Sequence, residues 1–441
     1  EYSVPAIVGM IVNSIYNIVD RIFIGNSSDL GTFGLAGITI GFPIMIILLS
    51  IGLLFGVGGA TLFSIKLGEG QSEEADRALG NAFSLMVIAG ALFMITGQIL
   101  LRPLLTLFGA SEAVLPYSME YMRVIFFGAV FQVIGMGMNN FIRADGSPRT
   151  AMLTMFLGAG LNTLLDPLFI YVFRMGMTGA ALATILAQCI SATWVVMYFI
   201  GKRSKHKLKR KYMKLKLNVV LTITSLGIPG FALQLANSLL NAILNKSLLI
   251  YGGDIAVSGM GIINSLQTIF YMPVIGIKQG VQPIISFNYG ARKFDRVKEA
   301  VKLAVISATA IVVFGYVITR LFPRQIISIF NRDPELIEFG SYGITAWFLC
   351  MPVVGFQIIT SHFFQAIGKS KAAMFLTLTR QVIFLIPALI IFPKFWGISG
   401  LLHAAPFADF FSALLTGIWF YYGNKNLEKY PLATISNNSI K

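Results

Sequence analysis

The chain has 441 residues, of which 56% are hydrophobic and only 12% are charged, and its mean hydropathy is +0.76. An ordinary soluble domain has about 25% charged residues, so this composition excludes the soluble globular classes. The formal net charge of +15 could suggest nucleic acid as a partner, but no base-reading motif accompanies it. Repeated apolar runs of roughly 20 residues predict an all-α polytopic membrane protein in the lipid bilayer.

Twelve apolar segments, separated by short polar breaks, are predicted to form transmembrane helices. In chain order they cover residues 4–24, 33–63, 79–101, 116–142, 149–172, 178–200, 218–250, 256–288, 297–319, 337–366, 371–392 and 398–422. Because twelve is an even number, both termini are expected on one side of the membrane. The chain starts at Glu1 almost directly in a helix, so a few N-terminal residues are expected to be missing.

The basic residues are distributed unevenly between the two sides. With cytoplasmic termini, the inward loops and the tail carry 23 of the 34 Lys and Arg residues, and the outward loops carry six. Cytoplasmic loops normally hold such an excess, so the protein is predicted in the inner (plasma) membrane with both termini cytoplasmic. The densest run, "KRSKHKLKRKYMKLK" at residues 202–216, is then a cytoplasmic loop with a weak attraction to anionic lipids. The outward Arg320, Arg324 and Arg332 are the weak point of this orientation.

The two halves of the sequence repeat each other at an offset of 221 to 224 residues. "VPAIVGMIVNSIYN" at 4–17 aligns with "IPGFALQLANSLLN" at 228–241, and "FIRADGSPRTAM" at 141–152 aligns with "FFQAIGKSKAAM" at 363–374. Parallel six-helix repeats are typical of transporters. The predicted domains are an N-terminal six-helix lobe (1–200), a basic cytoplasmic linker (201–217), a C-terminal six-helix lobe (218–424) and a cytoplasmic tail (425–441).

Three acidic residues, Asp20, Asp166 and Asp409, fall within predicted spans. A charge at the bilayer centre costs about 2.5–3.5 kcal/mol on insertion scales, so an acid there is a functional candidate by default. Asp166, in "LNTLLDPLFIY", has Asn162 one helical turn before it. Asp409 lies near "PFADFF" without a pattern of polar partners, which favours a structural role.

Asp20, in "NSIYNIVDR", shares one helix face with three polar residues, Asn13, Tyr16 and Asn17. Burial disfavours the carboxylate anion, whereas amide and phenol donors stabilise it, so a balanced group can load and release protons. The alternative is that both acids serve as helix caps or make packing hydrogen bonds. Arg21 could also neutralise Asp20, although adjacent helical residues point about 100° apart.

The second half has no acid at the equivalent place. Asn237 and Asn241 are expected to face inward by symmetry with the first helix, but an amide does not titrate. Among the basic residues in its spans, Lys246 and Arg380 could extend to a membrane interface, whereas Lys278, in "VIGIKQGVQP", lies deeper. Lys278 is therefore a candidate for the lining of a cavity.

Other reactive residue types indicate no enzyme, metal centre or cofactor. Cys189 and Cys350 are widely spaced in apolar spans and are interpreted as packing residues. His362 and His403 have no ligand spacing and are interpreted as structural. The sequence has no GxxxxGK[ST] motif, so nothing suggests ATP as the energy source.

These features resemble the multidrug and toxic compound extrusion (MATE) transporters. The resemblance rests on "P…NSIYNIVD" in the first helix, "ADGSPRTAM" after the fourth and "LNTLLDP" in the fifth, and it covers essentially the whole chain. The presence of acids in the first lobe, without acidic partners in the C-terminal lobe, is similar to the DinF-like branch. The acids of the NorM-like branch are absent from "NSLLNAILNKSL" and "FQIITSHFFQAIG".

The resemblance implies a V-shaped bundle of two pseudo-symmetric six-helix lobes that exports cationic, lipophilic compounds in exchange for H⁺ or Na⁺. It implies a cation site in the first lobe made of Asp20, Asp166, Asn162, Tyr16, Asn13 and Thr184, and a disputed bend of the first helix at Pro5. The predicted substrate cavity includes Asn17, Asn139, Asn237, Asn241 and Lys278.

The expected function is secondary active export by a monomer that alternates access between two lobes. A lipid-linked saccharide flippase of the same superfamily is the leading alternative, because the basic residues in the second-half spans could bind pyrophosphate. A channel is disfavoured by the internal duplication and by the buried acids. An enzyme is the least expected class, since no nucleophile–base pair is visible.

Overall fold

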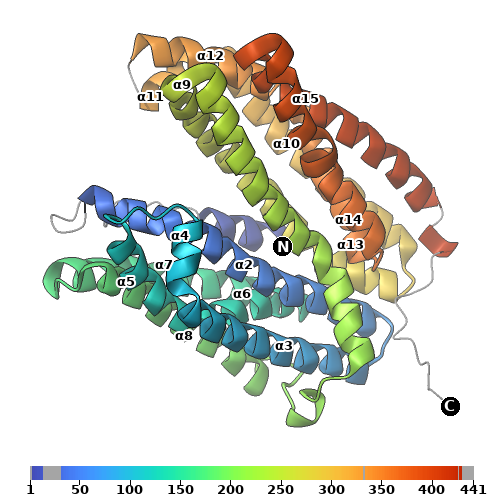
Figure 1. Cartoon of the computed structure of the whole chain (residues 1–441). Coiled ribbons are helices and arrows are strands. Elements are labelled where there is room, and N and C mark those ends of the chain that lie inside the picture. The colour runs from blue at the N-terminus through green and yellow to red at the C-terminus, as the bar shows by residue number, and fades with distance from the viewer. Residues whose placement is uncertain (1, 13–30, 331–332, 426, 430–441) are drawn as a thin grey trace. The chain divides into compact units, whose positions relative to one another are not determined.

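The computed structural model describes residues 2–12, 31–330, 333–425 and 427–429, and the regular structure in these ranges is helical (Figure 1). The predicted all-α class is therefore confirmed. Four predicted site residues, Asn13, Tyr16, Asn17 and Asp20, lie outside the described residues, as does Arg21.

Contacts divide the chain into two compact units, with the boundary between Phe231 and Ala232. The helices of the first unit are coloured blue to green in Figure 1, and those of the second unit yellow-green to red. The boundary lies inside a helix rather than inside the predicted linker 201–217.

The first unit begins with a short apolar helix, Ser3–Val12. Its other helices are α2 (Gly31–Gly68), α3 (Ser72–Ile99), α4 (Leu101–Leu107), α5 (Leu115–Phe127), α6 (Ala129–Ala144), α7 (Pro148–Pro167), the π-helical η1 (Leu168–Val172), α8 (Gly176–Ile200), the 3-10 turn η2 (Arg210–Tyr212) and the start of α9 (Leu217–Gly290).

The second unit contains the rest of α9 and the C-terminal helices. These are α10 (Phe294–Leu321), α11 (Pro323–Phe330), α12 (Pro334–Trp347), α13 (Met351–Ala366), α14 (Ser370–Leu378), the π-helical η3 (Thr379–Leu385), α15 (Ile386–Lys425) and the 3-10 turn η4 (Leu427–Lys429).

Within the described residues, eight helices are long and apolar enough to cross a membrane, or up to ten when each bent pair is one span. The Ser370–Lys425 segment counts as one of these, yet its 56 residues would extend about 84 Å at 1.5 Å per residue. It is broken at Gly397, where φ is +56°, just as α9 is broken at Gly253 with φ +64°. Glycine adopts such angles without a steric penalty, so each break separates two passes.

Every predicted span from 33–63 onward has a matching helical segment, but several ends and two shapes differ. The predicted helix 116–142 is bent by 56° at Gly128, and the predicted helix 337–366 is bent by 49° between α12 and α13. A Cβ built on Gly128 would clash with the side chain of Ile185, so α8 packs directly against the first bend. Because hydropathy reports only the apolar part of a helix, α3 begins at Ser72 instead of the predicted residue 79.

The repeat seen in the sequence is also visible in the geometry of corresponding loops. The loop before α7 contains Gly146 with φ +88°, and the loop before α14 contains Gly368 with φ +83°. Ser147 and Lys369 then occupy the corresponding N-cap positions with similar backbone angles. The two halves thus share local backbone structure as well as sequence.

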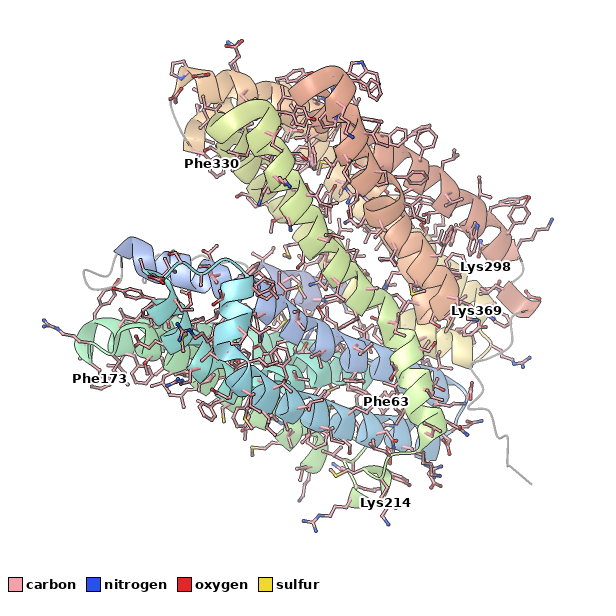
Figure 2. The ribbon with its side chains drawn as sticks, viewed as in Figure 1. Phe63, Phe173, Lys214, Lys298, Phe330 and Lys369 are labelled. Carbon is pink, nitrogen blue, oxygen red and sulfur yellow. The ribbon has the colours of Figure 1, made fainter. Side chains whose placement is uncertain are left out.

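The lysines labelled in Figure 2 mark one end of each unit. In the first unit Lys214 lies at the end opposite Phe173, and in the second unit Lys298 and Lys369 lie at the end opposite Phe330 (Figure 2). The positive-inside bias predicts that the lysine end of each unit faces the cytoplasm.

The basic linker packs on the first unit instead of hanging free. Asn81 of α3 donates to the carbonyl oxygen of Tyr212 at 2.9 Å and accepts from the amide of Lys216 at 2.8 Å. Asp76 of the same helix contacts His206 Nδ1 at 2.8 Å. The sequence predicted a loop here, and the structure adds that α3 holds both of its halves.

Candidate cation site in the first unit

The candidate site lies on α7 and α8, the fifth and sixth helices of the first repeat. α7 starts with Pro148 in its first turn and ends at Pro167, which has no backbone N–H to donate. The chain continues as the π-helical η1, a local geometry that is frequent at functional sites. Asp166 therefore precedes a local change in the backbone.

Three polar side chains meet in the interior of this helix pair. Asp166, Asn162 and Thr184 are 0%, 3% and 6% exposed. The Nδ2 group of Asn162 lies 3.4 Å from Asp166 Oδ1 and 3.3 Å from Thr184 Oγ1. The Thr184 hydroxyl donates to the Ala180 carbonyl oxygen at 3.1 Å. The structure thus brings together three of the residues predicted for the cation site.

One buried acceptor of the site has no donor among the described residues. Asn162 Oδ1 is buried and accepts no hydrogen bond among the described residues. It lies on the same amide group that donates to the Asp166 carboxylate. An acceptor without a donor costs about 1–3 kcal/mol when buried. A proton or a small cation would relieve this cost, because carboxylate, amide and hydroxyl oxygens are the ligands that hard cations prefer.

The first helix also packs on α7, two turns before Asn162. A Cβ built on Gly9 would lie 2.7 Å from Met155 Sδ, and Met155 is seven residues before Asn162 on the same helix face. Pro5 is buried in the first turn of the helix Ser3–Val12, where a missing N–H breaks no helical hydrogen bond. The predicted bend at Pro5 remains a prediction.

Asn139, predicted for the substrate cavity, is 6% exposed and has both ends of its amide engaged. Its Nδ2 group donates to the Ala151 carbonyl oxygen at 2.9 Å, and its Oδ1 accepts from Arg143. Arg143 also donates to Asn140 at 2.8 Å. These contacts tie the end of α6 to the start of α7.

The predicted cavity residues of the second unit are in different surroundings. Asn237 Oδ1 accepts from Gln381 Nε2 at 2.9 Å, which links α9 to η3. Asn241 is exposed on α9, and Lys278 is partly exposed farther along that helix. All three residues belong to the second unit, whereas the Asp166 site belongs to the first.

The second unit also contains an ion pair that sequence reasoning missed. Arg380 Nε donates to Asp409 Oδ1, with side chains 10% and 3% exposed. The expectation that Arg380 extends to a membrane interface is therefore wrong. The ion pair supplies the polar partner of Asp409 that the sequence pattern did not show, and it agrees with the structural role expected for this residue. The available signal was one acid and one base in neighbouring spans, since intramembrane charges usually pair.

Two bundles of apolar helices, each with a polar group buried between its fifth and sixth members, define a duplicated multi-pass membrane protein of the transporter type. A family model described as MatE matches residues 5–168 and 229–390, once in each half. The chain belongs to this family, the MATE transporters.

Individual relatives agree with this assignment. The multidrug export protein MepA of Staphylococcus aureus (strain MSSA476) is 26% identical over 416 residues, which are 94% of this chain and 91% of that protein. A ligand-bound structure of the MATE multidrug transporter DinF-BH is 36% identical, with a TM-score of 0.90 over 97% of this chain and 96% of that one. This likeness supports the DinF-like branch.

A third relative is a MOP superfamily transporter from Pyrococcus furiosus, for which a reverse polarity of the binding pocket suggests a different function. It is 25% identical, with a TM-score of 0.90, and covers 97% of this chain and 95% of that one. The twelve-helix MATE fold is therefore common to proteins whose pockets differ in polarity.

Proposed function

We propose that the chain is a secondary active multidrug exporter, which exchanges cationic lipophilic compounds for H⁺ or Na⁺ by alternating access. It would act as a monomer in the plasma membrane, with both termini cytoplasmic. Membership of the MATE family and the names of the relatives support multidrug export.

The observation that carries the cation-exchange proposal is the buried, unpaired amide oxygen of Asn162 beside the Asp166 carboxylate. Asn162 Oδ1 accepts no hydrogen bond among the described residues. The Thr184 hydroxyl group already donates its hydrogen to a backbone carbonyl oxygen, so it is not available to Asn162. A proton on Asp166 supplies the missing donor, while Na⁺ would take several of these oxygens as ligands. Predicted partners on the first helix, Asp20 among them, would add further oxygens.

The energetics depend on how many protons are loaded. Exchange of one monovalent cation for one proton moves no net charge, and each pH unit then supports about a tenfold substrate gradient, because about 1.4 kcal/mol is one decade. If Asp20 and Asp166 both load, voltage adds about 2.3 kcal/mol per 100 mV. Coupled acids can also share a single proton.

The flippase alternative is weakened by the second unit. Binding a pyrophosphate group needs several free cations, but Arg380 is already neutralised by Asp409. Lys246 is exposed on α9, so Lys278 is the remaining inward candidate among the three predicted.

The test uses proteoliposomes, rhodamine 123 as the organic cation and an imposed pH gradient without sodium. We expect uphill movement of the dye, and loss of that movement in Asp166→Asn and Asp20→Asn. Glu112→Gln, an exposed acid outside the helices, is the matched control and should transport normally.

Each other outcome has a separate meaning. Dye movement that ignores pH but follows a sodium gradient replaces H⁺ by Na⁺ as the coupling ion. Uphill movement that survives in Asp166→Asn removes the coupling role of that residue. No uphill movement with either ion rejects the exporter and favours lipid-linked substrates.

A further inference from the structure

The second segment of α9, which follows the break at Gly253, carries a stripe of polar residues along one face. Gln267, Tyr271, Lys278 and Gln282 recur at helical spacing. Gln267 accepts from Trp347 Nε1 of α12 at 3.0 Å. This end of the stripe therefore faces α12 inside the second unit.

The same helix also contacts the end of α13. Ser286 Oγ of α9 donates to the Ala366 carbonyl oxygen at 2.8 Å. Lys278 lies two turns before Ser286 on α9, and His362 lies one turn before Ala366 on α13. The hydrogen bond between Ser286 and Ala366 therefore places both residues on the adjoining stretches of this helix pair.

Lys278 differs from the other two basic residues predicted inside spans of this unit. Arg380 is paired with Asp409, and Lys246 is exposed. Lys278 is only partly exposed, and it forms no ion pair within the part of the chain that the structure describes. An ammonium group held away from water needs a counter-charge or acceptor oxygens.

His362 adds a second polar group without an acceptor. It is 7% exposed, and its Nε2 has no hydrogen-bond partner among the described residues. Gln365 hydrogen-bonds the ring, and its amide group can either donate or accept at the other nitrogen. The imidazole can therefore carry a proton on Nε2 and donate it to a ligand.

When His362 carries its proton on Nε2, this place has more donors than acceptors among the described residues. A Lys ammonium group offers three N–H donors, and the adjacent imidazole offers one more. An anionic oxygen group meets both needs at once, because it supplies negative charge and several acceptor positions.

We infer that Lys278 and His362 form a binding site for the anionic oxygen group, carboxylate or phosphate, of an amphiphilic molecule. A zwitterionic amphiphile, with a carboxylate beside its cationic centre, is then a substrate class of this exporter. The inference rests on the proposed export function and extends it beyond simple cations.

Rhodamine 110 and its methyl ester rhodamine 123 provide a matched pair of probes, because they differ only in whether the carboxylate is free. Their dissociation constants would be measured by fluorescence polarisation on the full chain in phosphatidylcholine nanodiscs. We expect Lys278→Gln to weaken rhodamine 110 about tenfold, the size of one hydrogen bond to a charged group, without weakening rhodamine 123.

Further variants separate binding from folding. Lys278→Arg keeps the positive charge and should retain most of the preference for rhodamine 110. His362→Gln keeps a donor at a similar place and should cost only a few-fold. Lys246→Gln removes the exposed lysine of the same helix and should leave both dyes unchanged.

A second arm identifies the source of the anionic group. Dioctanoyl phosphatidylglycerol would be added as a competitor of rhodamine 110. Competition in the wild type that is lost in Lys278→Gln assigns the site to a lipid phosphate. Absence of competition, with the carboxylate preference intact, assigns it to a soluble zwitterion.

Two results overturn the inference. One is equal weakening of both dyes in Lys278→Gln, which would mean a structural role, and the other is no effect on either dye. The exporter proposal is judged separately by pH-driven movement of rhodamine 123, which the carboxylate site does not touch. Failure of the anion site would therefore leave the exporter standing.

Discussion

The fifth and sixth helices of each repeat bury polar groups, but the two units fill that place with different chemistry. In the first unit the Asp166 carboxylate is next to the amide of Asn162, which also reaches Thr184. In the second unit Asp409 is bound by the guanidinium group of Arg380. A fixed counter-ion keeps a carboxylate charged, whereas neutral partners allow its occupancy to change.

The two units therefore share the arrangement of their helices, but the residue that contacts each buried acid differs. That contact decides whether the acid can exchange a cation or forms a permanent ion pair. The π-helical η1 follows Asp166, and the π-helical η3 contains Arg380, so both units distort the same helix near the charge. One distortion accompanies a candidate exchange site, and the other a static ion pair.

The largest expected effect comes from breaking the ion pair of the second unit. Arg380→Met leaves Asp409 buried without a counter-charge and should cost about 3–5 kcal/mol of stability. Asp166→Asn in the first unit should cost far less, because it removes a buried charge without leaving a partner charged. Thermal unfolding in detergent measures both variants.

A double variant provides the control for this prediction. Arg380→Met with Asp409→Leu removes both charges and should recover most of the lost stability. If the single Arg380 variant were as stable as the wild type, the ion pair would carry no structural role, and the contrast between the units would fail.

The second-largest expected effect is on the stability and protease resistance of the basic linker, which packs on α3 of the first unit. Asn81→Ala removes the donor to Tyr212 and the acceptor for Lys216, which should cost about 1–3 kcal/mol and free the basic segment. Limited trypsin digestion should then cut within residues 202–216 several-fold faster. Thr96→Val is the comparison, because Thr96 is exposed on the same helix and its hydroxyl group bonds only to carbonyl oxygens of α3. Equal cutting in both variants would place the anchor elsewhere.

A smaller effect is expected from the hydroxyl group of the cation site. Thr184→Val keeps the shape of the side chain but removes the oxygen, and it should slow pH-driven dye movement about fivefold, equivalent to about 1 kcal/mol. Thr193→Val is a matched control, because Thr193 is exposed on the same helix and also donates to a carbonyl group four residues earlier. Equal rates in both variants would remove Thr184 from the site.

The smallest effects concern the corresponding loops before α7 and α14, where burial acts on opposite charges. Burial raises the pKa of Asp145 in the first unit, although hydrogen bonds from Ser204 and Tyr198 oppose the shift. Burial lowers the pKa of Lys369 in the second unit.

The signs follow from linkage. Asp145 contributes stability below its unfolded pKa, and that contribution is lost as the pH rises through the higher folded pKa. Lys369 contributes stability above its unfolded pKa, and that contribution is lost as the pH falls through the lower folded pKa. The free energy of unfolding would be measured from about pH 4 to 10. Relative to the wild type, it should rise with increasing pH in Asp145→Asn and with decreasing pH in Lys369→Gln, each by less than about 1 kcal/mol. Parallel deviations would contradict the difference between these loops.

Much of the fold could be predicted because apolar length and repeat spacing are local properties of the sequence. The spacing of Asn162 and Asp166 likewise fixed one face of a helix, and the structure confirms that their side chains meet. The bends at Gly128 and before α13 were not predicted, because hydropathy does not report the direction of a helix.

Contacts between helices were the harder part. Arg380 and Asp409 are 29 residues apart, and their pairing depends on how η3 packs on α15. The hydrogen bonds of Asn139 to Ala151 and Arg143 also join residues of two helices, which sequence spacing does not report, while its place in the substrate cavity stays a prediction. The docking of the linker on Asn81 likewise depends on tertiary packing, which a charge count does not describe.

The boundary between the units, inside α9, has a practical consequence for cutting the chain in two. A cut within the basic linker would leave residues 217–231 attached to the second polypeptide, although they belong to the first unit. This segment packs tightly on α2, because a Cβ built on Gly227 would clash with the Leu54 carbonyl oxygen. Two separately expressed halves would thus reassemble through the non-covalent contacts of residues 217–231 with α2.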